Sequence, residues 1–400
     1  MRLTFDDDVE AYRAELAAWL DANAPSAEDA SERPKSTADV PAWARAWQRK
    51  MFDAGWLVPG NAPEFGGRNA SLVEQFVHRE ELDRRNITMS HNPQGLGIIV
   101  PSLLMFGTDE QKQRWALPLL RAEKTAALGM SEPGAGSDLA GLRTRAELKG
   151  DHFVINGQKV WTSGAHDADL ILAFVRTDPD APKHKGISCI VVPTDTPGVT
   201  RRPFPSFIHR EDLDFNEVYF DDAVVPAENL IGELHQGWKV ANGSLGHERS
   251  MLWLDFFGNL MRFLETFRNA VDTEHTPASS ADPLVLDAYG NAAIDAMALK
   301  LLGMRAIAHA RRGVTAGDES LLKLLGSEGM QRAAQDGLDL LGPFALDDRR
   351  PASEGHHLQL EGYDGSWMDR FQRSFAATIA GGTSEIQRNI LAERVLGLPR

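Results

Sequence analysis

Apolar side chains recur at helical spacing through the first third of the chain. Near its start, four of them follow each other at steps of three or four residues: Val9, Tyr12, Leu16 and Leu20. This spacing is typical of an amphipathic helix, and it returns over 42–54, 72–84 and 108–120. The stretch from Pro25 to Pro41 is polar and contains prolines, so we expect a connection there.

Near Ala126 the pattern changes to short apolar runs of the kind that form strands. Three such runs are separated by loops rich in proline and glycine: Leu170–Arg176, Ile187–Val192 and Glu217–Phe220. Between Phe153 and Trp161, two further β-prone runs flank the dipeptide Asn156-Gly157. Because Asn-Gly is typical of tight hairpin turns, we expect a hairpin that turns at these two residues.

Helical spacing resumes after Gly237 and continues to the end, interrupted by a polar loop over 272–281. The pattern therefore predicts an α+β protein with three domains. We expect a helical N-terminal domain over 1–125, a middle antiparallel β domain over 126–235 and a helical C-terminal domain over 236–400.

Composition narrows the function classes. With 42% apolar and 25% charged residues, the chain has the profile of a globular protein. Its net charge of −15 argues against nucleic acid as a partner and against a polybasic membrane anchor. The apolar run Leu96–Phe106 contains Pro101 and is too short for membrane insertion. The acidic start does not resemble a signal peptide, so we expect a cytoplasmic protein.

Cysteine and histidine usage does not favour a metal site. The single cysteine, Cys189, cannot form an internal disulfide or a multi-cysteine cluster. The twelve histidines show none of the spacings that hold zinc in helical or finger motifs. We therefore expect no metal ion.

A glycine-rich segment, Met130–Asp138, is the first candidate for ligand binding. Its sequence is Met-Ser-Glu-Pro-Gly-Ala-Gly-Ser-Asp, and its two glycines would let the backbone approach a ligand closely. The segment lacks the third glycine of a dinucleotide-binding fingerprint, because Leu139 follows, and no Gly-Lys-Ser/Thr marks a phosphate-binding loop. A plain turn that leads into the β domain is the alternative interpretation.

A second candidate is Gly381–Arg388, which introduces the last helix. Ser384 and Gln387 have the spacing of a capping box. The two glycines before them could bring backbone N–H groups to a phosphate or a carbonyl oxygen. A capped helix without any ligand is the alternative.

The third candidate is Glu248. It falls at steps of three and four among Trp238, Ala241, Leu245 and Leu252, so a carboxylate occupies a position in an apolar stripe. An unpaired buried carboxylate has a raised pKa and can act as a general base. Pairing with an arginine from another helix is the alternative.

These segments, together with two in the β domain, resemble the acyl-CoA dehydrogenase family of flavoenzymes over nearly the whole chain. The motifs that carry the resemblance are 131–138 (SEPGAGSD), 156–163 (NGQKVWTS), 217–222 with 225–229 (EVYFDD, VPAEN) and 382–388 (GTSEIQR). The resemblance implies a helical domain, a β domain and a four-helix-bundle-like domain, with FAD as cofactor. It also implies roles for eight residues in binding the cofactor: Met130, Ser131, Gly136, Ser137, Trp161, Ser163, Thr383 and Glu385.

The implied reaction is α,β-dehydrogenation of an acyl-CoA thioester, as in fatty acid or lipid degradation by β-oxidation. Many members of the family have a glutamate where this chain has Gly381, which cannot accept a proton. A subset has the base on the helix after the β domain, just before an arginine, and Glu248-Arg249 fits that pattern. The resemblance therefore implies Glu248 as the base. Arg249 would shape the substrate site, Ser137 would also contact CoA, and the Gly381 N–H would bind the thioester carbonyl.

The resemblance also bears on partners. An electron-transfer flavoprotein is the implied electron acceptor. The stretch 262–281 lacks the family's Arg-x-x-Phe-Gly segment, and Asp339 stands where glutamine is common. Both positions complete a neighbouring subunit's site in the family, so a homo- or hetero-oligomer, as a dimer or tetramer, is implied. Two alternatives are a flavin-dependent monooxygenase or oxidase of the same fold and a non-catalytic subunit of a mixed complex.

Overall fold

A computed structural model describes residues 5–26, 30, 32, 34–206, 213–273, 276–314, 317–347 and 366–399, without the side chains of 244–251. The chain forms two compact units, each described here by itself. The β unit comprises Ala18–Ala70 and Thr88–Glu248, and the helical unit comprises Met1–Ala17, Ser71–Ile87 and Arg249–Arg400. Helices α1 (Asp7–Asn23) and α7 (Gly237–Ala270) have residues in both units.

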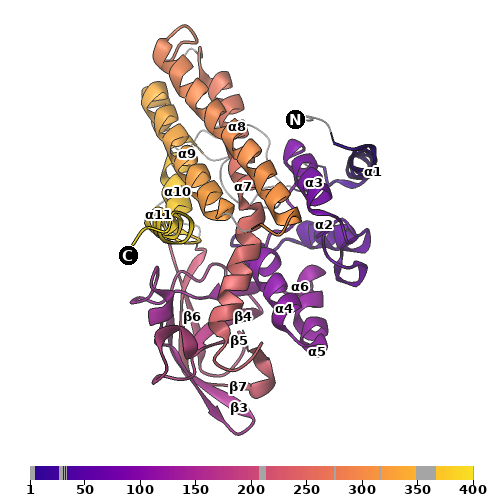
Figure 1. Cartoon of the computed structure of the whole chain (residues 1–400), viewed down its shortest axis with the longest axis vertical. Helices are drawn as coiled ribbons and strands as arrows, with labels where there is room; N and C mark the ends of the chain where they lie inside the picture. Colours follow the sequence, from indigo (N-terminus) through magenta and orange to yellow (C-terminus); the bar gives the residue numbers. More distant parts are fainter. Residues whose placement is uncertain are drawn as a thin grey trace. The chain divides into compact units, whose positions relative to one another are not determined.

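The strands of the β unit form one eight-stranded sheet in the described part of the chain. They are β1 (Ala126–Gly129), β2 (Arg145–Lys149), β3 (His152–Lys159), β4 (Leu170–Arg176), β5 (Ile187–Pro193), β6 (Val199–Phe204), β7 (Phe215–Pro226) and β8 (Leu230–Ile231). Their order is β6-β7-β3-β2-β4-β5-β8, and β1 pairs with β4. Most neighbours are antiparallel, but β4 is parallel to both β1 and β2. Figure 1 shows the long β3 and β7 strands side by side.

The predicted hairpin turn at Asn156-Gly157 is wrong, because both residues lie inside β3. The chain turns one strand earlier, at Gly150, which has a φ of +65°. Gly157 instead marks an irregularity in the pairing of β3 with β7. A Cβ at this position would lie 2.6 Å from the Cα of Thr144, so glycine permits a close approach of two backbones.

Short helices of the β unit precede the sheet in sequence. They are α2 (Ala42–Asp53), α4 (Val100–Phe106), α5 (Asp109–Gln111) and α6 (Leu117–Leu120), with π turns at Gly95–Ile99 and Lys112–Ala116. The predicted helix over 108–120 is thus present, with a π turn in its middle. The sheet buries alternate apolar side chains, among them Phe153, Ile155 and Val218.

The helical unit is built from long helices whose apolar faces share one core. Its further elements are α3 (Leu72–Arg84), α8 (Pro283–Arg311), α9 (Asp318–Leu341), α10 (Trp367–Ile379) and α11 (Ser384–Ile390). Helix α9 packs against α8 and α10, which are drawn in orange to yellow in Figure 1. Trp253, Phe267 and Trp367 are almost fully buried in this core. Gly303 makes room for the Trp253 indole, since a Cβ there would lie 2.4 Å from it.

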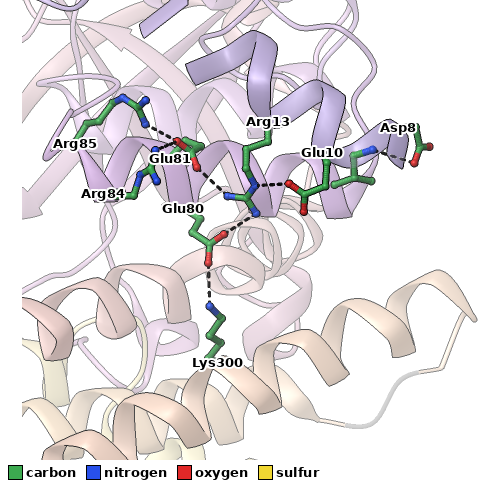
Figure 2. A network of polar contacts seen from close by, with 9 residues as sticks. Asp8, Glu10, Arg13, Glu80, Glu81, Arg84, Arg85 and Lys300 are labelled. Atoms are coloured by element: carbon green, nitrogen blue, oxygen red, sulfur yellow. Dashed lines mark hydrogen bonds and ion pairs between the residues drawn. The ribbon is translucent and has the colours of Figure 1, made fainter. Parts of the chain in front are cut away.

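A buried carboxylate joins α1 to α3 within the helical unit. The Glu81 side chain is 1% exposed and accepts from Arg13 at 2.8 Å, from Arg84 at 3.0 Å and from Arg85. Arg13 also contacts Glu80, which pairs with Lys300 of α8 at 2.9 Å. Figure 2 shows these charges as one connected network across α1, α3 and α8.

None of the described helices has a stretch that is both long and apolar enough to cross a membrane.

Candidate functional site

The glycine-rich loop of the β unit follows directly after β1. Glu132 and Ala135 exchange backbone hydrogen bonds of 3.0 and 3.1 Å, which close a tight turn. Gly134, Gly136 and Ser137 are exposed. A Cβ at Gly134 or Gly136 would meet no atom of the described chain within 4 Å, so the backbone is open to a ligand on this side.

A buried ion pair lies beneath this loop. The ammonium of Lys159, which is 0% exposed, donates to the Oε1 atom of Glu132 at 2.8 Å and to the carbonyl of Met130 at 3.1 Å. Burial lowers the pKa of Lys159 to about 8, against the opposing effect of Glu132. Burial also opposes charge on Glu132, but Lys159 and two backbone N–H donors hold the pKa of this carboxyl below its usual value.

Trp161, two residues after Lys159, presents its indole at the surface. It adopts a φ of +59°, which is uncommon for a bulky residue, and its side chain is 60% exposed. The rings of Phe204 and Phe215 meet the indole edge-to-face at 5.2 and 5.4 Å. The indole is therefore supported from the protein side and leaves a large apolar surface uncovered.

The loop after Trp161 is fixed by one buried amide. Asn216 Nδ2 donates to the carbonyls of Thr162 at 3.1 Å and Asp214 at 2.8 Å. The backbone N–H of Thr162 donates in turn to the carbonyl of Asn216 at 3.2 Å. Ser163, half-buried, is thereby held next to Trp161.

A basic turn lies next to the glycine-rich loop. Lys183–Lys185 forms a short 3-10 turn with the sequence Lys-His-Lys, and all three side chains are exposed. Lys183 pairs with Asp138 at 2.7 Å. Arg176 donates to the carbonyl of Lys183 at 2.8 Å and to that of Ala140 at 2.6 Å, so its guanidinium ties the two loops together.

In the helical unit, the predicted site residues Gly381, Thr383 and Glu385 lie at the start of α11. Gly381 and Gly382 have φ angles of +66° and +92°, which favour glycine. Gln387 is buried, and its Nε2 donates to the carbonyls of both glycines at 3.1 and 3.3 Å. Within the described residues, neither glycine N–H has a hydrogen-bond acceptor.

The predicted capping box at Ser384 and Gln387 is wrong. Thr383 is the N-cap, and its hydroxyl accepts from the backbone N–H of Ile386 at 3.3 Å. Gln387 is one residue too far along the helix to complete a box with Thr383. It is available to the glycine carbonyls for that reason.

Two of the predicted residues, Glu248 and Arg249, lie within α7, but the structure does not describe their side chains. Their roles stay predictions. The other predicted residues form two groups. Met130, Ser131, Gly136 and Ser137 share a loop, which the Val160 N–H joins to the Trp161 segment by a 2.9 Å bond to the Ser131 carbonyl. The second group is the one at α11.

Three residues next to these groups were not predicted as site residues: Lys159, Asn216 and Gln387. A signal for Lys159 was present, because it falls on the same alternate positions as the buried Phe153 and Ile155. A lysine on the core face of a strand needs a partner. Asn216 and Gln387 carry no comparable signal, since their roles depend on backbone carbonyls that folding brings to them.

Comparison with known proteins identifies related domains over most of the chain. Three family models match: the N-terminal domain of acyl-CoA dehydrogenase over residues 6–123, the middle domain over 127–223 and the C-terminal domain over 235–396. Acyl-CoA dehydrogenase IpdE1 of Mycobacterium tuberculosis is 34% identical over 397 residues, which cover 98% of each protein.

Two solved structures share the fold over the whole length. One, described as a variant of the Tcur3481-Tcur3483 steroid ACAD, is 31% identical with a TM-score of 0.79 and covers 98% of this chain and 99% of that one. The other, the ChsE4-ChsE5 complex of M. tuberculosis, is 29% identical with a TM-score of 0.81 and full coverage of both chains.

Proposed function

This chain belongs to the acyl-CoA dehydrogenase family, and from that premise we propose that it converts an acyl-CoA thioester to the trans-2-enoyl-CoA with Glu248 as the base. The family consists of flavoenzymes with FAD as cofactor, which oxidise a CH–CH bond of an acyl-CoA. The observation that carries the proposal for this chain is the open glycine-rich loop beside an exposed, supported Trp161.

The described residues of the β unit fit a flavin. An isoalloxazine ring needs a flat apolar partner, and the indole of Trp161 is uncovered on one side while two phenyl rings support it. The cofactor also needs backbone polar groups within reach, and the free space at Gly134 and Gly136 permits that approach. In this unit, six residues would hold FAD: Met130, Ser131, Gly136, Ser137, Trp161 and Ser163. Thr383 and Glu385, at the start of α11, are proposed as cofactor-binding residues on the strength of the family motif.

The chain's own residues divide the chemistry. Glu248 takes the α-proton of the substrate, and Arg249 shapes the site beside it. The N–H of Gly381 donates to the thioester carbonyl, which makes the α-hydrogen more acidic. The free N–H groups and the Gln387 bonds to both glycine carbonyls support this role. FAD, when bound, would supply the hydride acceptor for the β-hydrogen of the substrate.

For the substrate, we propose an acyl group with a fused-ring or otherwise bulky carbon skeleton. A relative that covers 98% of this chain at 31% identity is described as a steroid ACAD, which supports this class. The base at position 248 supports it too, because family members with this placement often take branched, long or ring-bearing acyl chains.

For the CoA phosphates, we propose the basic turn Lys183–Lys185. It is tied to the glycine-rich loop through Asp138 and Arg176, and it offers cations in a chain with a net charge of −15. We expect Lys185→Glu to raise KM for an acyl-CoA about tenfold with kcat unchanged, because charge reversal weakens ground-state binding. Steady-state kinetics measures this, with exposed Lys149→Glu as the control. An unchanged KM would contradict the assignment.

We also propose an electron-transfer flavoprotein as the electron acceptor and a hetero-oligomer as the assembly. A relative solved as the ChsE4-ChsE5 complex supports the mixed assembly. The absent Arg-x-x-Phe-Gly segment supports it as well.

We propose three domains, over residues 1–125, 126–235 and 236–400. The start of β1 at Ala126 and the start of α7 at Gly237 support these two boundaries.

The test is a panel of acyl-CoA thioesters mixed without oxygen with the FAD-loaded protein, purified with any partner that accompanies it. We expect loss of the flavin absorbance near 450 nm and one enoyl-CoA per flavin reduced, fastest with steroid-derived acyl groups. Flavin that stays oxidised with the whole panel would contradict the dehydrogenase. Oxygenated product with rapid reoxidation in air would replace it with an oxidase or monooxygenase.

A further inference from the structure

We propose that Lys159 and Glu132 form a positioning pair that holds the Met130–Ser131 segment in the conformation that binds the flavin. The inference rests on the proposed function, because that function places Met130 and Ser131 against FAD. It adds two residues that do not themselves touch the cofactor.

The end of β3 fixes two consecutive carbonyl groups of the loop. The Lys159 ammonium donates to the carbonyl of Met130 at 3.1 Å, and the N–H of the next residue, Val160, donates to the carbonyl of Ser131 at 2.9 Å. These bonds orient both peptide groups from the protein side. The end of β3 therefore helps to set the position of the segment.

Glu132 extends the same support to the start of β2. Its Oε2 accepts from the N–H of Arg143 at 2.6 Å, and its Oε1 accepts from the N–H of Thr144 at 2.8 Å and from Lys159 at 2.8 Å. One carboxylate thus connects the loop, β2 and β3. Shortening it would remove all three contacts together, and neutralising it would weaken them.

Packing stability does not explain why this pair is charged. Removing two charges from water costs several kcal/mol per ion, and apolar replacements of buried pairs are often neutral or stabilising. The ammonium here makes a directed contact to a loop carbonyl that an apolar side chain could not make. Burial lowers the pKa of Lys159, but only to about 8. Because this value lies above neutral pH, the ammonium keeps its charge there in spite of the cost of burial.

The test compares FAD binding and loop protection in matched variants. The double variant K159M/E132Q removes both charges, so it leaves no isolated buried charge that would unfold the protein. K159M alone is the second variant. The control is Asn229→Leu, which removes a buried bond of 2.8 Å to the Val191 carbonyl elsewhere in the β unit. The protein is used with any co-purifying partner, and each variant is compared at equal folded fraction by circular dichroism.

We expect both lysine variants to raise the Kd for FAD at least tenfold and to speed deuterium uptake over 130–138 at least tenfold. Asn229→Leu should change neither by more than about twofold. An unchanged Kd and unchanged uptake over 130–138 in the double variant would overturn the positioning role. Neither readout uses acyl-CoA, so a failure of the dehydrogenase proposal in the substrate panel would be distinguishable from a failure of this one.

Discussion

At the scale of single residues, the described chain buries several polar groups, and their partners distinguish their roles. Lys159 is satisfied by a carboxylate and a carbonyl. His91 differs, because it is 2% exposed and neither ring nitrogen has a hydrogen-bond partner among the described residues. Its ring packs edge-on against Trp43 at 5.0 Å. Burial lowers the pKa of His91 to about 4, so its side chain is a neutral imidazole in the folded protein at neutral pH.

This burial predicts acid sensitivity. Because the unfolded chain binds a proton at His91 below about pH 6.5 and the folded chain does not until about pH 4, the free energy of unfolding should fall as pH decreases through this window. The loss should reach about 3 kcal/mol near pH 4. Urea unfolding at several pH values measures it. His91→Phe should flatten the slope, whereas His152→Phe, at a partly exposed position, should not. Equal slopes in all three proteins would contradict this account.

Residue-level inference from sequence reached the exposed and the glycine positions of the site, but not the groups beneath them. Gly136 and Trp161 were identified through the family's motifs, and the structure leaves both open to a ligand. The buried position of Lys159 was implicit in strand alternation. Gln387 could not be assigned, because its amide bonds depend on the turn that two positive-φ glycines make.

At the scale of elements, Glu81 connects helices distant in sequence. Three arginines surround its carboxylate: Arg13 of α1, and Arg84 and Arg85, which follow Glu81 by three and four residues (Figure 2). Burial opposes the charge, but these arginines keep the pKa of Glu81 below its usual value. Because the Glu81 carboxylate is almost fully buried and hydrogen-bonded, removing it would leave these arginines without their anion, which destabilises the fold.

We expect Glu81→Gln to destabilise the helical unit by about 2–3 kcal/mol, because it leaves arginines without their anion. Glu10→Gln is the control: Glu10 also contacts Arg13, at 3.2 Å, but it is half-exposed. Its loss should cost less than about 1 kcal/mol. Urea unfolding followed by tryptophan fluorescence compares the two. A smaller effect for Glu81 than for Glu10 would show that the network does not contribute as described.

Element prediction succeeded where one periodicity dominated and failed where local chemistry had two meanings. The helix over 72–84 and the strand over 170–176 agree with α3 and β4 in both limits. Asn156-Gly157 has the composition of a turn, yet tertiary contact with Thr144 requires the glycine inside a strand. The capping box failed similarly, because Thr383 and Ser384 both suit an N-cap and only the backbone decides between them.

At the scale of the whole molecule, the residues proposed to hold FAD come from two separate stretches of the sequence, 130–163 and 383–385. The sequence lacks segments that complete a neighbour's site in the family, which underlies the proposal of a mixed assembly. Neither feature could be derived from periodicity, since assembly depends on surfaces rather than on the core.

We expect the chain to bind less than one FAD per subunit when purified alone and the full complement of its complex when co-expressed with a related chain that supplies the missing segment. Absorbance at 450 nm relative to protein, with mass measured by light scattering, gives both quantities. A homo-oligomer saturated with FAD would contradict the mixed assembly.

The central claim is that Glu248 abstracts the α-proton, and rapid anaerobic mixing with an acyl-CoA that bleaches the wild-type flavin tests it most directly. We expect Glu248→Gln to slow flavin reduction by about 10²–10⁴-fold with FAD content unchanged, because the amide keeps the shape of the side chain but accepts no proton. The control is Glu265→Gln, at an exposed position of the same helix, and its flavin should be reduced at the wild-type rate. Near-normal reduction in Glu248→Gln would contradict the account.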